Sequence, residues 1–235
     1  MAEGVVGFSG SALSAATVSA IERRMVIGPT AVIVARRAAV ALVKPKVTKL
    51  VPYVGWAIAV GSAVYAGYEA YRATEVQWAK MEAETYDEAD MAVFRIGYTE
   101  ASRAFAPTPD GLAAARNKWK FILIPSEVMP MVAAVDTVGM ATYGNVLQWD
   151  PANKAARRYK ATSGLPPAGP IAYQDGSILR GSWEEYPFAS TWSSIPGAHV
   201  DRAPLRENWI QGGFIRAAAS VQGFKPGETV RTFIL

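Results

Sequence analysis

The 235-residue sequence contains no cysteine and one histidine, His199. The absence of cysteine excludes disulfide frameworks, thiolate zinc sites, iron–sulfur clusters and cysteine nucleophiles. A single histidine excludes multi-histidine metal sites, and a Ser-His-Asp triad would have to use that one ring. Any chemistry of this chain therefore depends on carboxylates, amides, hydroxyls and basic side chains.

Charge is also scarce. Charged residues make up 19 % of the chain and the net charge is +4 at pH 7, whereas 51 % of the residues are hydrophobic. Global disorder is excluded, because such a chain can bury a core of one large domain or two small ones. The small basic excess is compatible with a phosphate-rich partner, but ordinary soluble proteins often show as much.

The N-terminal half is apolar. Its first residues include Glu3 and lack a basic region, so we expect no secretory signal peptide. An uncharged run over 51–68 is at the lower limit for crossing a bilayer. Small residues recur at every fourth position of this run: Gly55, Ala59, Ala63 and Gly67. We interpret the segment 28–72 as a buried helical hairpin or as a membrane-inserting one, with a membrane, chaperone or adaptor as its contact.

Helical periodicity continues over 65–105, which predicts one long helix or two. Acidic residues crowd part of it, and we interpret them as a solvated face rather than a metal site: Glu82, Glu84, Asp87, Glu88 and Asp90. The sequence APTPDG at 106–111 then ends the helix. We place a domain boundary there, between an α-helical region over 1–107 and a second domain over 108–235.

Short alternating elements follow the boundary. The order predicts an α+β domain, with a strand at 119–124, a helix from Ser126 to about Gly139, a strand at 146–149, a basic helix after Pro151, strands at 178–189 and 199–204, a helix at 206–221 and a final strand at 230–235. Two strands followed directly by a helix are the order of a ββα-metal nuclease finger.

Two motifs lie on these last elements. The first is EEYPFAST at 184–191, and the second is RENWIQGG at 206–213. Together they resemble the NucA/NucB deoxyribonuclease family, and the stretches IPSEVMPMVAAVDT and GFKPGETVRTFIL are similar to its lead-in and closing strand, so the resemblance covers about 118–235. It implies a small α+β nuclease domain with a ββα-metal finger. The apolar α-helical region over 1–107 that precedes this domain matches nothing in the family.

Hydrolysis of a phosphodiester needs a base to activate water, a divalent cation to hold the phosphate, and a residue that orients the base. His199 lies nine residues before Asn208, at the start of the second predicted strand, which is the wrong place for the base. The resemblance implies a carboxylate there instead, carried by the pair Glu184 and Glu185. The family most often has aspartate where this chain has Glu184.

Motif position favours Glu184 as the base and leaves Glu185 as a metal ligand or an ion-pair partner. Neighbouring side chains of a strand point to opposite faces, so one of the two enters the site more easily. The resemblance implies that Asn208 binds the metal or holds the base, with a helix cap as the alternative. Glu207 is expected to help position a hydrated ion.

The phosphate contacts that we expect are Arg206, Gln211 and Arg216, although either arginine also fits an ordinary surface charge. The overall hypothesis is a Mg²⁺- or Mn²⁺-dependent, largely sequence-nonspecific DNA endonuclease. The layout is similar to a bacterial toxin that a specialised secretion system exports into a target-cell cytoplasm, which implies a cognate immunity protein. The alternatives are a membrane-associated structural or pore-forming protein with a non-catalytic nuclease-like domain, and an RNase on the same scaffold.

Overall fold

The computed structural model describes residues 75–173 and 176–235. The described part of the chain belongs to two compact units, one that reaches Thr85 and one that runs from Tyr86 to Leu235. Residues 75–82 of the former are helical. The segment 28–72, with its uncharged run, lies outside the described residues. Among those that are described, no helix combines the length and the apolarity needed to cross a membrane.

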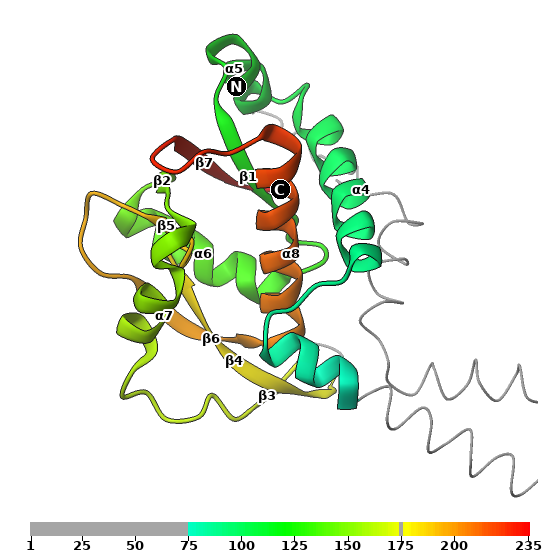
Figure 1. The fold of residues 1–235 in the computed structure, drawn as a ribbon, viewed down its shortest axis with the longest axis vertical. Coiled ribbons are helices and arrows are strands. Elements are labelled where there is room, and N and C mark those ends of the chain that lie inside the picture. Colours follow the sequence, from blue (N-terminus) through cyan, green and yellow to red (C-terminus); the bar gives the residue numbers. More distant parts are fainter. Residues whose placement is uncertain (1–74, 174–175) are drawn as a thin grey trace, which may run out of the picture. The chain divides into compact units, whose positions relative to one another are not determined.

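The unit Tyr86–Leu235 mixes helices and strands, as the α+β prediction requires (Figure 1). Its elements in chain order are α4 (Glu88–Phe105), α5 (Pro109–Asn117), β1 (Lys120–Ile124), α6 (Pro130–Tyr143), β2 (Val146–Trp149), η1 (Pro151–Asn153), α7 (Lys154–Thr162), β3 (Pro170–Ala172), β4 (Ile178–Tyr186), β5 (Thr191–Trp192), β6 (His199–Pro204), α8 (Leu205–Gln222) and β7 (Thr229–Ile234).

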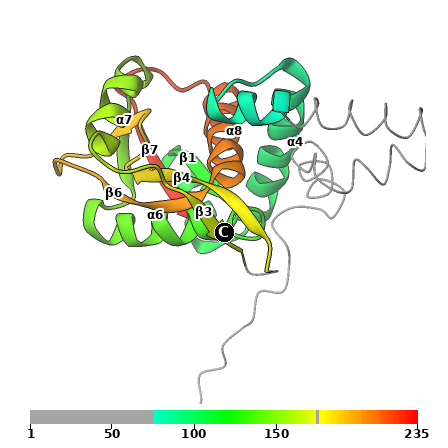
Figure 2. The same cartoon turned by 90° about the horizontal axis from the view of Figure 1, so that it is seen from below.

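Two sheets form the framework. One has the order β1-β7-β2-β5, with β1 parallel to β7 and the other pairs antiparallel. The other is antiparallel and has the order β3-β4-β6. Helix α6 packs on β4 and β6, and α8 packs on β1 and β4 (Figure 2). Strand β4 therefore has helices against the face that turns toward the core.

Helix α4 begins with two acids of the predicted solvated cluster. The Asp87 side chain accepts a hydrogen bond from the Asp90 backbone N–H at 2.8 Å, and Asp90 accepts one from the Asp87 N–H at 3.0 Å. This reciprocal capping box satisfies N–H groups that would otherwise lack partners. Asp90 is only 2 % exposed, so the prediction of a solvated face is wrong for this residue.

The packing of α4 on α8 extends the C-terminal unit beyond the predicted boundary at residue 108. Phe94 of α4 lies edge-on to Trp209 and Phe214 of α8, with ring centroids 5.2 and 6.0 Å away. A Cβ on Gly213 would lie 2.4 Å from the Phe94 ring, so the glycine permits this approach. Since α4 buries its aromatic face here, the prolines at 106–111 mark the turn between α4 and α5 inside one compact unit.

Helix α6 begins at Pro130 and ends at Tyr143, so the predicted bounds Ser126 and Gly139 are wrong. Ser126 does not cap the helix, because its backbone N–H and its hydroxyl both donate to the Leu235 carbonyl at the end of β7. The chain turns over 125–129, and proline then occupies the first helical position, where its missing N–H costs nothing.

Strands β4 and β6 pair antiparallel and β6 leads directly into α8, so the predicted strand–strand–helix order is present. Glu184 pairs with Asp201 and Glu185 pairs with Val200 in this ladder. The two motifs found in the sequence are thereby brought together, because EEYPFAST begins with the last three residues of β4 and RENWIQGG forms the first turns of α8.

Candidate functional site

Glu184 and Glu185 both lie at the buried end of β4, with exposed fractions of 1 % and 2 %. Alternation along the strand turns their side chains to opposite faces. Glu184 meets α6 and α8, whereas Glu185 meets α7. The two faces therefore contain different partners.

On the face of Glu184, a glutamine amide links two carboxyl groups. The Gln211 Nε2 atom of α8 donates to Glu184 Oε1 at 2.8 Å and to Asp136 Oδ2 of α6 at 3.0 Å. All three side chains are buried, with Asp136 fully so. We name this set the acid–amide cluster. It joins β4, α6 and α8 inside the protein.

Burial raises the pKa of Asp136 and of Glu184 well above the usual range of a carboxyl group. The negative charge of Asp136 raises the pKa of Glu184 further, while the hydrogen bond from Gln211 acts in the opposite direction. Two carboxylates that share one amide cannot both ionise cheaply away from water. The acid–amide cluster therefore favours holding a proton.

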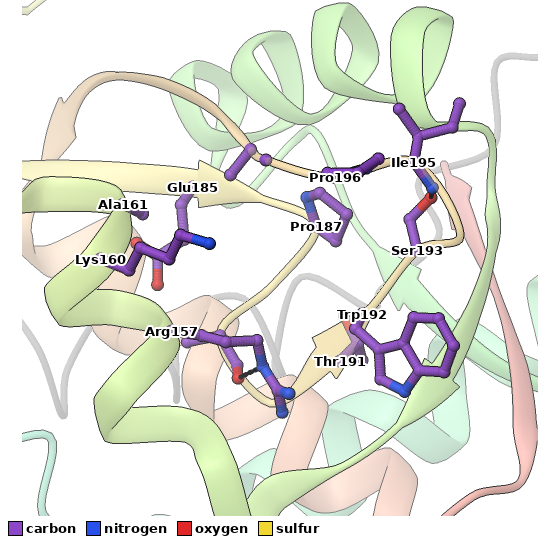
Figure 3. Close-up of a pocket in the computed structure, with 13 residues that line it drawn as sticks. Arg157, Lys160, Ala161, Glu185, Pro187, Thr191, Trp192, Ser193, Ile195 and Pro196 are labelled. Carbon is purple, nitrogen blue, oxygen red and sulfur yellow. Dashed lines mark hydrogen bonds between the residues drawn. The ribbon is translucent and has the colours of Figure 1, made fainter.

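On the opposite face, Glu185 Oε1 accepts a hydrogen bond from Arg158 Nε at 2.8 Å, which forms an ion pair between β4 and α7. Glu185 also lines a cavity of about 360 Å³, with α7 on one side and the chain over 187–198 on the other (Figure 3). Burial raises the pKa of Glu185, and the Arg158 guanidinium opposes that rise. Of the two glutamates, Glu185 is the one that reaches a cavity.

Further cations lie around Glu185. Lys154, at the start of α7, has its pKa lowered first by burial and second by the charge of Arg216, while Glu185 raises it. The Arg216 guanidinium of α8 also stacks over the Tyr86 ring, 4.6 Å from its centroid. Helix α7 thus brings two positive charges toward Glu185, while Arg216 of α8 acts on one of them, Lys154.

Asn208 lies one turn into α8, beyond the start of the helix at Leu205, so it is not the helix cap. Its Nδ2 atom donates to the Trp183 carbonyl of β4 at 3.0 Å, one residue before the acid pair. Its Oδ1 atom is buried and has no hydrogen-bond partner among the described residues. Asn208 therefore holds α8 to β4 and keeps one acceptor oxygen available.

Glu207 is engaged elsewhere. Its Oε2 atom accepts the backbone N–H groups of Met131 and Val132 at 2.9 and 3.0 Å, in the first turn of α6. A carboxylate at this position satisfies free N–H groups and interacts favourably with the positive end of the helix dipole. Glu207 thus caps α6 from a distant part of the chain, which accounts for a helix without a capping side chain of its own.

The expected phosphate contacts are dispersed. Gln211 donates hydrogen bonds from Nε2 to both carboxyl groups of the acid–amide cluster. Arg206 stacks over the Tyr173 ring at 4.6 Å. Arg216 is the one of the three whose charge acts on Lys154, itself close to Glu185. His199 starts β6 opposite Tyr186, so strand alternation turns its side chain to the face opposite that of Glu185.

Sequence reasoning missed Asp136 and assigned no role to Arg158. A signal existed for the former, because Asp136 is the one charged residue in the apolar helix α6. An isolated acid on an otherwise uncharged helix indicates a buried, partnered carboxyl group. For Arg158 no sequence signal separates it from its basic neighbours on α7.

Candidate metal ligands are sparse in the described part of the chain, where no three His, Cys, Asp or Glu side chains form a group that could hold an ion. Buried oxygens without hydrogen-bond partners are nevertheless present at Glu185 Oε2 and Asn208 Oδ1. Carboxylate and amide oxygens suit a hard cation, and Mg²⁺ is typically held by one or two carboxylates while it keeps several waters. By its chemistry, each of these two oxygens is suited to bind such an ion.

Comparison with known proteins agrees with the motifs. No curated protein matches this sequence as a relative. The family model described as Deoxyribonuclease NucA/NucB matches residues 138–233, which run from the middle of α6 through β7 and include both motifs. The C-terminal end of this chain is therefore a NucA/NucB deoxyribonuclease domain.

Proposed function

We propose that this protein is a metal-dependent, largely sequence-nonspecific DNA endonuclease. The family match implies deoxyribonuclease activity, and the site adds the observation that carries the proposal: a buried glutamate, Glu185, that lines a cavity beside the cations of α7. A site built on carboxylate, amide and basic side chains addresses backbone phosphate, which carries no sequence information directly.

We assign the base to Glu185. Motif position alone favours Glu184, but that side chain is enclosed in the acid–amide cluster, whereas Glu185 reaches the cavity. As a base, Glu185 takes a proton from a water molecule. The water oxygen then bonds to phosphorus, the bond to the sugar oxygen breaks, and the departing oxygen takes a proton from solvent. Glu184 acts through Gln211, which fixes β4 relative to α8.

Asn208 would help to hold Mg²⁺ or Mn²⁺ through its Oδ1 oxygen, which has no hydrogen-bond partner among the described residues, and this leaves Glu185 Oε2 available to take the proton. Such an ion, when bound, supplies charge that stabilises the phosphate as negative charge develops on it. Glu207 supports this arrangement indirectly, because its contact with α6 fixes the first turn of α8. Arg216 is the best placed of the expected phosphate contacts.

The biological setting is proposed from the layout alone. An apolar N-terminal region before a DNase domain fits a bacterial toxin that is exported by a specialised system and acts in a target-cell cytoplasm. A producer of such a toxin needs an immunity protein, and the segment 28–72 would contact a membrane, chaperone or adaptor. The described residues hold no feature that favours a structural or pore-forming role.

Nicking of supercoiled plasmid by the full-length chain tests the enzymatic proposal. We expect relaxed and then linear DNA with Mg²⁺ or Mn²⁺, little base preference at the cut ends, and no cleavage in EDTA. The rate should fall steeply with added salt, because phosphate contacts release counterions. A parallel assay on RNA measures sugar selectivity. Cleavage that EDTA leaves undiminished would refute the metal-dependent mechanism.

A further inference from the structure

We propose that the cavity beside Glu185 binds the base and sugar of one unpaired nucleotide, so that this enzyme prefers single-stranded DNA. The inference rests on the proposed nuclease function and names its preferred form of substrate. Three features of the cavity carry it: its size, its aromatic and apolar wall, and one cation that has no partner in the part of the chain that the structure describes.

The cavity has a volume of about 360 Å³, at the small end of the range of about 300–1,000 Å³ for ligand pockets. This volume suits a single nucleotide better than a base pair. Because Glu185 forms part of the wall, a nucleotide bound there lies directly beside the proposed base. The cavity would thus hold the nucleotide that adjoins the phosphodiester bond to be cut.

One wall is apolar and contains an indole. Trp192 and Ile195 line the cavity although they remain 40 % and 46 % exposed, and Pro187 and Pro196 complete this side (Figure 3). Such large apolar side chains are not covered by the protein itself. An aromatic face stacks on any base, so this wall would recognise a nucleobase without regard to its identity.

The opposite side carries charge. Arg157 lines the cavity, but its guanidinium already donates hydrogen bonds to Asp150 and to the Ala189 carbonyl. Lys160 lines the same cavity and has no hydrogen bond or ion pair within the described residues. A lysine left in this state can pair with a phosphate of the bound nucleotide. Aromatic wall and lysine together match the two ends of a nucleotide.

An unpaired strand fits this cavity better than a duplex does. A base in double-stranded DNA is stacked and paired, so it must be extruded before it can enter a pocket, and that extrusion costs free energy. A base in a single strand is unpaired, so its entry into the pocket costs far less free energy. Duplex cleavage would then depend on the phosphate contacts alone, while single strands gain stacking on Trp192.

The test is fluorescence anisotropy of a labelled 12-mer, single-stranded or in a duplex of the same sequence, with the full-length protein in EDTA to prevent turnover. We expect the single strand to bind about tenfold more tightly than the duplex. Trp192→Leu keeps the apolar bulk but loses the ring face, so it should abolish that preference. The matched variant Trp192→Phe keeps a ring and should retain most of it. Equal binding of the single strand by wild type and Trp192→Leu would overturn the proposal.

Competition provides a measurement that needs no variant. Deoxyadenosine monophosphate should displace the single strand while it leaves the duplex bound, and displacement of neither would overturn the proposal. Plasmid nicking separates this inference from the proposed function. If wild type nicks plasmid but shows no preference for single strands, the cavity proposal fails alone. If wild type cuts nothing, yet its single-strand binding depends on Trp192, the nuclease proposal fails and the cavity proposal stands.

Discussion

The two faces of β4 place two glutamate side chains in opposite environments. Glu184 and Glu185 are neighbours, both buried, and both have a raised pKa for which burial is the largest cause. Glu184 meets a second acid through a shared amide, whereas Glu185 meets an arginine and a cavity. The first setting favours a held proton, and the second favours a carboxylate that acts on a bound molecule.

The sharpest way to break this comparison is to neutralise each glutamate separately in the full-length chain. Glu185→Gln should lower the turnover of plasmid cleavage by about 10²–10⁴, the usual contribution of a positioned general base. Glu184→Gln keeps an acceptor for Gln211 and should lower turnover far less. Both replacements have the same shape, so each serves as the control for the other. The reverse result, with turnover lost in Glu184→Gln and kept in Glu185→Gln, would return the base to the position favoured by the motif.

The sequence predicted the order of elements around this strand, because apolar runs separated by proline and glycine mark short strands and helices. It also predicted that the two glutamates face opposite sides, since that follows from strand geometry. Which side faces the cavity depends on α6, α7 and α8, which come from distant parts of the chain. No local pattern could therefore assign the two roles.

Long-range contacts also explain why the start of helix α6 and the packing of α4 on α8 were not predicted. Helix α6 is capped by Glu207, 76 residues beyond Met131, so the capping signal is absent from its own sequence. Similarly, Gly213 in the second motif permits a close approach to α8, and the group that approaches is the Phe94 ring of α4. Because that partner precedes the proline-rich turn at 106–111, sequence reasoning placed it in another domain.

A second prediction sharpens the Glu185 side of the comparison. Arg158 lowers the pKa of Glu185, so Arg158→Gln should raise it. A base acts in its ionised form, and the low-pH limb of the cleavage rate should therefore move to higher pH in this variant. Arg158→Lys retains the charge and should move the limb less. A limb that stays in place in Arg158→Gln, at a measurable rate, would separate Glu185 from the titration that governs cleavage.

The smallest effect that we expect concerns stability on the Glu184 side. Asp136 has a folded-state pKa well above its unfolded value, which is about 3.9, so above that value the folded protein binds more protons than the unfolded chain. Its contribution to stability is therefore greatest at low pH and is lost progressively as pH rises toward the folded-state pKa. Asp136→Asn removes this titration. The free energy of unfolding of the variant, minus that of wild type, should rise with pH by at most about 1.4 kcal/mol per pH unit.

Urea unfolding of the full-length chain at pH 5, 6, 7 and 8, followed by tryptophan fluorescence, measures that difference. Glu228→Gln is the matched control, because the hydrogen bond from Lys120 lowers the pKa of Glu228, and this residue is ionised in both states across the whole range. Its difference from wild type should stay level with pH. A level difference for Asp136→Asn as well would mean that Asp136 ionises as readily in the folded protein as in the unfolded chain. Asp136 would then hold no proton at neutral pH, and any proton of the acid–amide cluster would belong to Glu184.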